Sequence, residues 1–396
     1  MKQETNNKKL GQEYIVFGSP LIGEEEIEEV VKTLRSGWLG TGPKTAEFEN
    51  MVSKMTGAKY SMAVNSCTAA LHLSLLAAGI GEGDEVITTP MTFCATANAI
   101  IHTGAKPIFV DVNLATMNID ETKIEDAITE RTKAILPVHF AGRPCEMDKI
   151  MEIAKKHHLL VVEDAAHAIG AEYKGRKVGS IADLTCFSFY VTKNITTGEG
   201  GMVLTNNKVF AEKIKILALH GMSKDAWKRF SDDGYKHYEV IYPGFKYNMM
   251  DIQASLGIHQ LQRIETCHKT RRQIWDFYNN ELKDLSVSLP GPIDQNMKHV
   301  FHLYTILVDE QKCGITRDQF LQEMHVRGIG TGVHYNPVHL HKYYRDSYGY
   351  KPGDYPNAEY IGNRTLSLPL GAKMTLQEAR RVTDAVKDIL LQYSKL

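Results

Sequence analysis

Short apolar, β-branched runs alternate with amphipathic segments between about residue 60 and residue 205. Six of these runs are predicted strands, at residues 85–88, 107–112, 134–138, 159–163, 184–189 and 202–205. Between them, segments such as 121–130 and 148–158 carry apolar residues three and four positions apart, a spacing typical of helices that cover a sheet. The alternation predicts an α/β fold with a mostly parallel sheet.

The pattern changes after Pro243. A long helical pattern covers residues 249 to about 282, a Gly/Pro-rich break follows at 289–292, and residues 300–308 resemble a strand. Residues 375–396 have the spacing of a closing helix, and the acidic residues 24–26 are typical of a helix's first turn. We therefore expect a flexible tail at 1–15, a large domain at 16–260 and a smaller domain at 261–396.

Composition narrows the functional classes. The 396 residues include 46 Lys and Arg against 47 Asp and Glu, so the chain lacks the positive field that attracts nucleic acid or anionic membranes. The longest apolar stretch, residues 69–80, contains His72 and Ser74 and is shorter than the ~20 residues of a spanning helix. Six scattered cysteines without a CxxC pair are typical of reduced thiols in a cytoplasmic protein. We expect no metal site, because the spacing of His334, His339 and His341 does not match a helical zinc pair.

Polar and aromatic residues follow four of the predicted strands. Ligands of open parallel sheets collect at the carboxyl ends of the strands, where this chain places Phe93, His139, Asp164, His167 and Lys193. Each residue alone has an ordinary interpretation: a helix cap for Asp164, a core side chain for Phe93 or His139, and a solvated charge for Lys193. Their common position at one edge of the sheet favours a binding site.

Residues 65–73 begin a helix with small and hydroxyl side chains, which leaves backbone N–H groups free to bind an anion. An ordinary helix cap by Asn65 or Ser66 is the structural alternative. No Walker loop or GxGxxG turn is present, which disfavours an NTPase or a nicotinamide enzyme. A phosphate cradle, an aromatic cover, Asp164 and Lys193 together are the parts that pyridoxal phosphate requires: Asp keeps the ring nitrogen protonated, and Lys binds the aldehyde as a Schiff base.

Several segments match one known family in order: residues 36–43, 66–71, 90–93, 137–139, 163–167, 188–201, 220–221, 244–254, 334–339 and 366–369. On these segments the chain resembles the sugar aminotransferases of the DegT/DnrJ/EryC1/StrS family, pyridoxal phosphate enzymes of the aspartate aminotransferase fold, fold type I. The resemblance covers nearly the whole chain. It implies a large domain with a mostly parallel sheet of the seven-stranded type between helices, and a smaller C-terminal α+β domain.

The resemblance also implies roles for individual residues. The predicted catalytic residues are Lys193, which carries the cofactor, Asp164, which pairs with the pyridine nitrogen, and His167, which lies near the ring hydroxyl. Phe93 stacks on the ring, and the phosphate is bound by Thr68, Ser188 and the backbone of Cys67. Asn248 reaches the cofactor of a neighbouring subunit, which implies a homodimer with shared active sites. By analogy, Trp38, His334 and Tyr335 line the substrate entrance.

The implied reaction moves an amino group from glutamate to a nucleotide-linked keto sugar, with pyridoxamine phosphate as the intermediate. Cys67 stands where relatives more often have Gly or Ala. Lys246 and Asn248 stand where many relatives carry Asn and Arg. That second departure is similar to the branch acting on UDP-linked 4-keto sugars, which favours a 4-amino (6-deoxy) sugar product for surface glycans.

Three alternatives remain. The first is a 3-aminotransferase for a dTDP- or GDP-linked keto sugar. The second is a related dehydratase, which the retained Lys193 disfavours because that branch has His at this position. The third is a non-catalytic sensor or binding module of the same fold.

Overall fold

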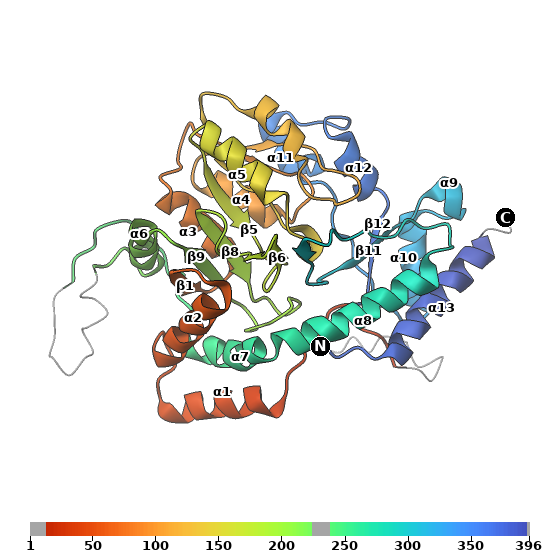
Figure 1. Cartoon of the computed structure of the whole chain (residues 1–396), viewed down its shortest axis with the longest axis horizontal. Helices are drawn as coiled ribbons and strands as arrows, with labels where there is room; N and C mark the ends of the chain where they lie inside the picture. The colour runs from red at the N-terminus through yellow and green to blue at the C-terminus, as the bar shows by residue number, and fades with distance from the viewer. Residues whose placement is uncertain (1–12, 224–237, 394–396) are drawn as a thin grey trace.

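The computed structural model describes residues 13–223 and 238–393, and its centre is a seven-stranded sheet (Figure 1). The strand order is β1 (Tyr60–Val64), β9 (Gly201–Thr205), β8 (Leu184–Ser188), β5 (Leu160–Asp164), β4 (Thr132–Ile135), β2 (Glu85–Thr88) and β3 (Lys106–Phe109). Neighbouring strands run parallel except for β9, which is antiparallel to both β1 and β8. The predicted α/β fold with a mostly parallel sheet is confirmed.

Helices cover both faces of this sheet. α3 (Cys67–Ala77) and α6 (Lys208–Ala218) share one apolar cluster with the strands, and α2 (Pro43–Thr56) and α7 (Asp251–Gln262) belong to another. α5 (Met147–Lys156) packs in a third cluster beside β4 and β5. Because both faces are covered, every residue of β2, β8 and β9 is buried, which explains their continuous apolar runs.

The structure differs from the predicted elements at three places. Residues 121–130 form two 3-10 turns, Glu121–Lys123 and Glu125–Ala127, instead of an α-helix, because Ile124 is the one fully buried apolar side chain there and supplies no continuous stripe. The long helix predicted at 249–282 is interrupted at Arg263, between α7 and α8 (Ile264–Leu282). The strand predicted at 300–308 is confined to β11 (Tyr304–Leu307).

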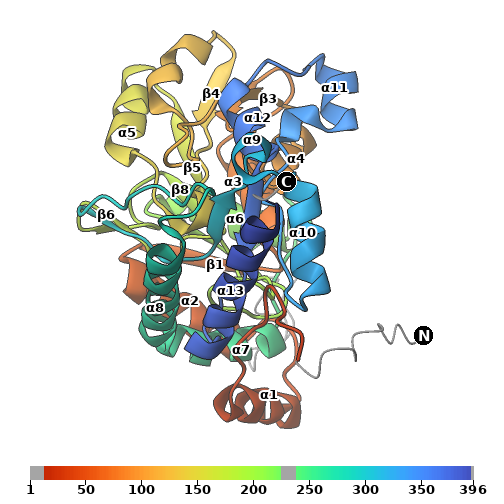
Figure 2. The same ribbon diagram turned by 90° about the vertical axis from the view of Figure 1, so that its right-hand side faces the viewer.

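The C-terminal part has its own apolar cluster, which surrounds a two-stranded sheet. β11 pairs with β12 (Thr365–Leu368), and α8, α10 (Arg317–Val326) and α13 (Leu376–Tyr393) pack against the pair (Figures 1 and 2). The predicted closing helix is α13, and the predicted helix beginning at the acidic run is α1 (Glu24–Ser36). The domain boundary at residue 260 stays a prediction, and it lies within one turn of the break between α7 and α8.

Part of the predicted small domain packs on the large sheet. α11 (Lys342–Tyr348) contributes Tyr344 to a cluster with Phe109 of β3 and Ala97 of α4 (Cys94–His102). The remaining elements are α9 (Glu310–Cys313), α12 (Pro356–Gly362), β6 (Glu172–Tyr173), β7 (Arg176–Lys177) and β10 (Met297–Lys298). The last three form a small separate sheet.

The predicted tail at 1–15 lies mostly outside the described residues. Its end is packed: Ile15 is buried, its N–H donates to the carbonyl of Gly328, and its carbonyl accepts from the N–H of Gly330.

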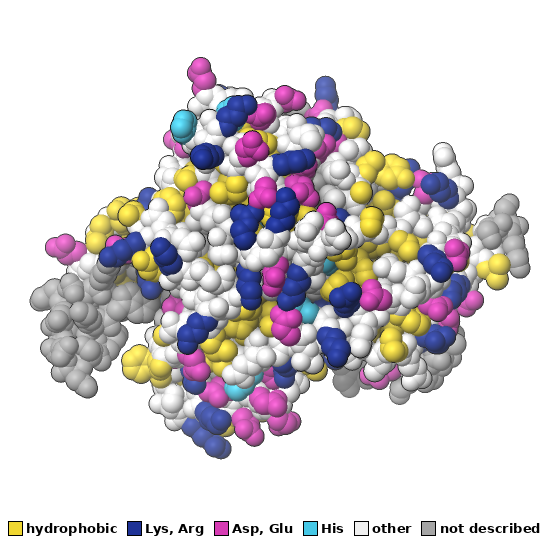
Figure 3. All heavy atoms as spheres, viewed as in Figure 1, with side chains coloured by type: hydrophobic (Ala, Val, Ile, Leu, Met, Phe, Trp, Pro, Cys, Tyr) yellow, Lys and Arg dark blue, Asp and Glu magenta, His cyan; other side chains and the backbone are white. Residues whose placement is uncertain are grey.

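Charges of both signs are interspersed over the face drawn in Figure 3, in keeping with the net charge of -1. Across residues 13–223 and 238–393, no helix is long and apolar enough to cross a membrane.

One buried carboxylate holds α2 and α7 together. Asp251 is 1% exposed, and its oxygens accept from the backbone N–H groups of Gly42 (2.8 Å), Lys44 (3.0 Å) and Thr45 (2.9 Å). The Thr45 hydroxyl donates to the same carboxylate at 2.6 Å. These N–H groups lie at the start of α2, where no helical carbonyl can accept them, so a residue distant in sequence caps this helix.

We expect Asp251→Asn to lower the free energy of unfolding by about 1–3 kcal/mol, because the amide nitrogen cannot accept and the charge at the helix terminus is lost. Chemical unfolding followed by circular dichroism measures the change. The matched control is Asp276→Asn, since Asp276 is exposed and lies 3.6 Å from Arg272; it should change stability by less than about 0.5 kcal/mol. Equal effects of the two substitutions would contradict the capping role.

Candidate active site

The carboxyl ends of β5 and β8 and the first turns of α3 and α4 meet around one cavity of about 570 Å³. Nine of the eleven residues predicted for the site line this cavity: Cys67, Thr68, Phe93, Asp164, His167, Ser188, Lys193, His334 and Tyr335. The structure therefore brings together segments separated by more than 250 positions of sequence. His139, which was also singled out at a strand end, is fully buried beside Glu163 at 3.2 Å and does not line the cavity.

Asp164 ends β5 and is 5% exposed. One carboxylate oxygen accepts from the Thr96 hydroxyl at 2.7 Å, and the other accepts from the N–H of Ala166 at 3.1 Å. Burial raises the pKa of Asp164, while the Thr96 and Ala166 hydrogen bonds favour the ionised form and oppose that shift. A cation placed against this carboxylate would stabilise the anion further.

Lys193 lies on the loop after β8, where its N–H donates to the carbonyl of Tyr190 at 2.9 Å. Burial lowers the pKa of Lys193, and the opposing attraction of Cys67 and Asp164 is smaller. A lysine with a lowered pKa is more often neutral near pH 7, and the neutral amine is the form that attacks an aldehyde.

The first turn of α3 faces the cavity through Cys67 and Thr68. Ser66 caps this helix, and its hydroxyl oxygen accepts from the N–H of Ala69 at 3.1 Å. Gly201 of β9 packs so closely that a Cβ there would lie 2.6 Å from the Cys67 nitrogen. A helix cap and an anion site are compatible here. Ser66 caps the helix, and the remaining N–H groups of the first turn are available for an anion.

One wall of the cavity is formed by the neighbouring rings of His167, His334 and Tyr335. His167 Nδ1 accepts from the N–H of Ala141 at 3.3 Å, and its Nε2 lies 3.2 Å from the Tyr335 hydroxyl. Burial lowers the pKa of His167 well below its ordinary value and lowers that of His334 to about 4. Both imidazoles are therefore neutral near pH 7.

Two predicted residues lie outside the cavity lining. Trp38 is 51% exposed, and its ring N–H donates to the carbonyl of Thr41 at 3.3 Å. Asn248 donates to the Thr41 hydroxyl at 2.7 Å, while its amide oxygen is buried without a hydrogen-bond partner. Their predicted roles at the substrate entrance and in a neighbouring subunit stay predictions.

Thr96, the residue that fixes Asp164, was not among the predicted site residues. Thr96 is 1% exposed and follows Phe93 by three positions, so one turn of α4 directs both residues toward the cavity. That spacing was visible in the sequence, but the partner of Thr96 depends on how α4 docks against β5. Phe93 stands at the N-cap position of α4 without a side-chain capping bond, and it is 60% exposed, which leaves its ring accessible in the cavity lining.

The cavity fits the predicted cofactor on the chemistry of its lining. A helix N-terminus suits the phosphate, the buried Asp164 carboxylate suits a protonated ring nitrogen, and the Lys193 amine suits the aldehyde. Among residues 13–223 and 238–393, no group of three His, Cys, Asp or Glu side chains is arranged to hold a metal ion.

Comparisons with known proteins agree with this assignment. Over 378 residues the chain is 50% identical to the spore coat polysaccharide biosynthesis protein SpsC of Bacillus subtilis, covering 95% of this chain and 97% of SpsC. Spr1654 of Streptococcus pneumoniae, assigned as a sugar aminotransferase and solved in its PMP form, superposes with a TM-score of 0.90 at 36% identity, covering 96% of this chain and all of Spr1654.

PseC of Helicobacter pylori, an aminotransferase involved in the biosynthesis of pseudoaminic acid, superposes with a TM-score of 0.89 at 32% identity, covering 96% of this chain and 100% of PseC. Spr1654 has also been solved in its PLP form, which bears out the cofactor predicted from the sequence. The profile of one family matches residues 20–387. On this match, the chain belongs to the DegT/DnrJ/EryC1/StrS aminotransferase family.

Proposed function

We propose that this protein transfers an amino group from glutamate to a nucleotide-linked 4-keto (6-deoxy) sugar, UDP-linked, and so supplies a 4-amino sugar nucleotide for surface glycans. The observation that carries the proposal is the convergence of Lys193, Asp164 and the α3 N-terminus on one cavity in a member of an aminotransferase family. The names of SpsC and PseC support a sugar substrate for glycan synthesis. Lys246 and Asn248 favour the UDP-linked branch.

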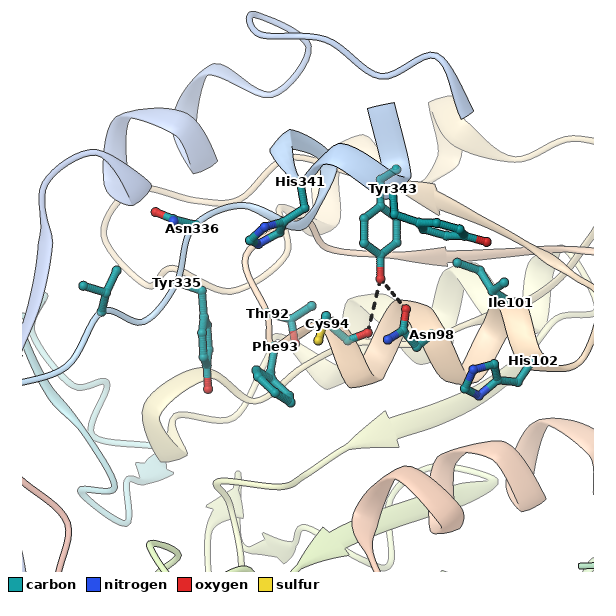
Figure 4. Close-up of a pocket in the computed structure, with 12 residues that line it drawn as sticks. Thr92, Phe93, Cys94, Asn98, Ile101, His102, Tyr335, Asn336, His341 and Tyr343 are labelled. Carbon is teal, nitrogen blue, oxygen red and sulfur yellow. Dashed lines mark hydrogen bonds between the residues drawn. The ribbon is translucent and has the colours of Figure 1, made fainter. Parts of the chain in front are cut away.

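A second cavity supports a large substrate. Its volume is about 740 Å³, and it shares Thr92, Phe93, Val333 and Tyr335 with the cofactor cavity. Figure 4 shows Phe93, Tyr335, His341, Tyr343 and His102 around it. An adjoining space with aromatic walls suits the rings of a sugar nucleotide better than the short side chain of an amino acid.

Hydrogen bonds hold the shape of this second cavity. The Tyr344 hydroxyl donates to the Asn98 amide oxygen at 2.5 Å, which ties α11 to α4. Tyr344 is 3% exposed, so its ring is fixed by packing as well. A preformed cavity costs less entropy on binding than one that must be ordered.

Bound pyridoxal phosphate would supply the aldehyde that accepts the amino group and the ring that accepts the electrons of the substrate. Lys193 is the residue that moves the proton, because it lines the cofactor cavity and burial favours its neutral form. The Asp164 carboxylate would stabilise positive charge on the ring nitrogen of the cofactor. His167 and His334 stay neutral and add no repelling charge.

We propose in addition a homodimer with shared active sites. The buried, unpartnered amide oxygen of Asn248 is one support, since such atoms are costly unless a donor reaches them. A second support is the exposed apolar run nearby, with Val240 65% and Ile241 50% exposed. In such a dimer the partner subunit would supply the donor that this oxygen lacks, and the second N–H of the Asn248 amide, beyond the one bonded to Thr41, would donate to the phosphate of the partner's cofactor.

The substrate proposal is tested with a panel of UDP-, dTDP- and GDP-linked keto sugars, each incubated with the enzyme and glutamate. We expect formation of 2-oxoglutarate and a 4-amino sugar from the UDP-linked 4-keto sugar, detected by mass spectrometry and NMR. A preferred dTDP- or GDP-linked substrate, or amination at carbon 3, would support the 3-aminotransferase alternative. Absence of turnover with every sugar, despite a bound cofactor, would support the sensor.

Lys193→Ala should abolish the visible absorbance of the bound cofactor and lower turnover by on the order of 10⁴-fold or more, because the reactive amine is lost. Borohydride reduction of the unmodified protein, followed by peptide mapping, should label Lys193. Lys193→Arg is the matched control, since it keeps the charge but cannot form the bond to the aldehyde, and should be equally inactive. A label on another lysine would contradict the assignment.

Shared sites are tested by mixing an Asn248→Asp variant with the Lys193→Ala variant. Asp at 248 places a negative charge where the phosphate is expected, so each variant alone should be nearly inactive. Hybrid dimers contain one site with both native residues and should recover up to about one quarter of the native activity per subunit after statistical exchange. Exchange is verified by mass spectrometry of tagged subunits, and verified exchange without recovery would contradict shared sites.

A further inference from the structure

Tyr335 occupies a boundary position in the site. It is one of the few residues that line both the cofactor cavity and the second cavity. In Figure 4 its hydroxyl points away from Asn336 and His341, and Ile101, His102 and Tyr343 lie on the far side of the second cavity. Its hydroxyl therefore serves the cofactor cavity, where it lies 3.2 Å from Nε2 of His167.

The direction of that hydrogen bond follows from the backbone. Ala141 has only an N–H to offer, so His167 Nδ1 must accept from it across 3.3 Å and carries no proton. His167 is neutral because burial lowers its pKa, so its single ring proton sits on Nε2. Nε2–H donates to the Tyr335 oxygen, and the Tyr335 hydroxyl proton remains available for another acceptor.

The acceptor follows from the chemistry of the cofactor. On the pyridine ring, the phosphate arm and the ring oxygen flank the aldehyde on opposite sides. With the phosphate at α3, the aldehyde at Lys193 and the ring nitrogen at Asp164, the oxygen would face the wall formed by His167, His334 and Tyr335. Because the Nε2–H of His167 already donates to Tyr335, the tyrosine hydroxyl is a free donor on this wall, whereas His334 bonds through Nδ1 to the Ser367 hydroxyl at 2.9 Å.

We propose that Tyr335 is the residue that donates a hydrogen bond to the ring oxygen of the cofactor, and that His167 is a positioning residue that directs the Tyr335 hydroxyl. This inference rests on the proposed function only for the identity of the cofactor. It changes the role expected for His167, whose contact with the ring oxygen becomes indirect. It also gives Tyr335 a role at the cofactor in place of the substrate entrance.

The surroundings of the hydroxyl are consistent with a donor. Burial raises the pKa of Tyr335 above its ordinary value, so the phenol keeps its proton throughout the working pH range. The titratable groups that face it are His167, His334, Lys193 and Asp164 in the cofactor cavity and Cys94 in the second cavity. The Tyr335 ring lies 6.2 Å from that of Phe93, so a Phe at 335 retains the packing.

The test is a pH titration of the visible absorbance of the holoenzyme without any sugar. A hydrogen bond to the ring oxygen favours the form in which that oxygen carries the full negative charge, which is the form left after the linkage to Lys193 loses its proton. Tyr335→Phe removes the bond and should raise the titration midpoint by about one pH unit. Tyr343→Phe is the matched control, since it removes a hydroxyl from the second cavity only, and should leave the midpoint unchanged.

His167→Leu tests the positioning role and provides a second variant should Tyr335→Phe fold poorly. It should move the midpoint in the same direction, and the double variant should move it no further than Tyr335→Phe alone, because the two residues act through one hydrogen bond. An unchanged midpoint in Tyr335→Phe, or additive shifts in the double variant, overturns the inference. A native holoenzyme without visible absorbance would instead overturn the cofactor assignment and the proposed function with it.

Discussion

The buried carboxylate of Asp164 is the constraint on which the rest of the site depends. An anion that is 5% exposed is stable only with donors or a cation around it, and the protein provides two donors, the Thr96 hydroxyl and the Ala166 N–H. The Thr96 bond joins α4 to the end of β5, and the Ala166 bond fixes the turn that follows the strand. The carboxylate retains capacity for a further partner, and a protonated ring nitrogen is a partner of the right charge.

Burial also sets the protonation of the groups around that carboxylate. It favours the neutral forms of Lys193, His167 and His334, each of which would otherwise carry or share a positive charge near pH 7. A site with several cations would repel a cationic cofactor ring. Electrostatic stabilisation is thus concentrated at Asp164. The wall formed by His167, His334 and Tyr335 contributes oriented hydrogen bonds instead.

Much of the fold and of the cofactor site was predictable because both follow from periodic patterns and strand ends. Asp164 and Lys193 come directly after apolar runs, and parallel strands bring their carboxyl ends to one edge. β1 was missed because its short sequence, YSMAV, has little β-branched character and depends on pairing with β9. The bond between Ala141 and His167 was unpredictable for a related reason: a backbone N–H carries no sequence signature.

The two adjoining cavities differ in charge, and this difference connects substrate recognition to assembly. The described lining of the second cavity includes no Lys, Arg, Asp or Glu. Such walls suit uncharged rings but leave a diphosphate without a counter-charge. A sugar nucleotide bound there must find its cations beyond that lining, and a partner subunit covering Val240 and Ile241 is one source of them. In the proposed dimer, the association that would complete the phosphate site through Asn248 would therefore complete the substrate site as well.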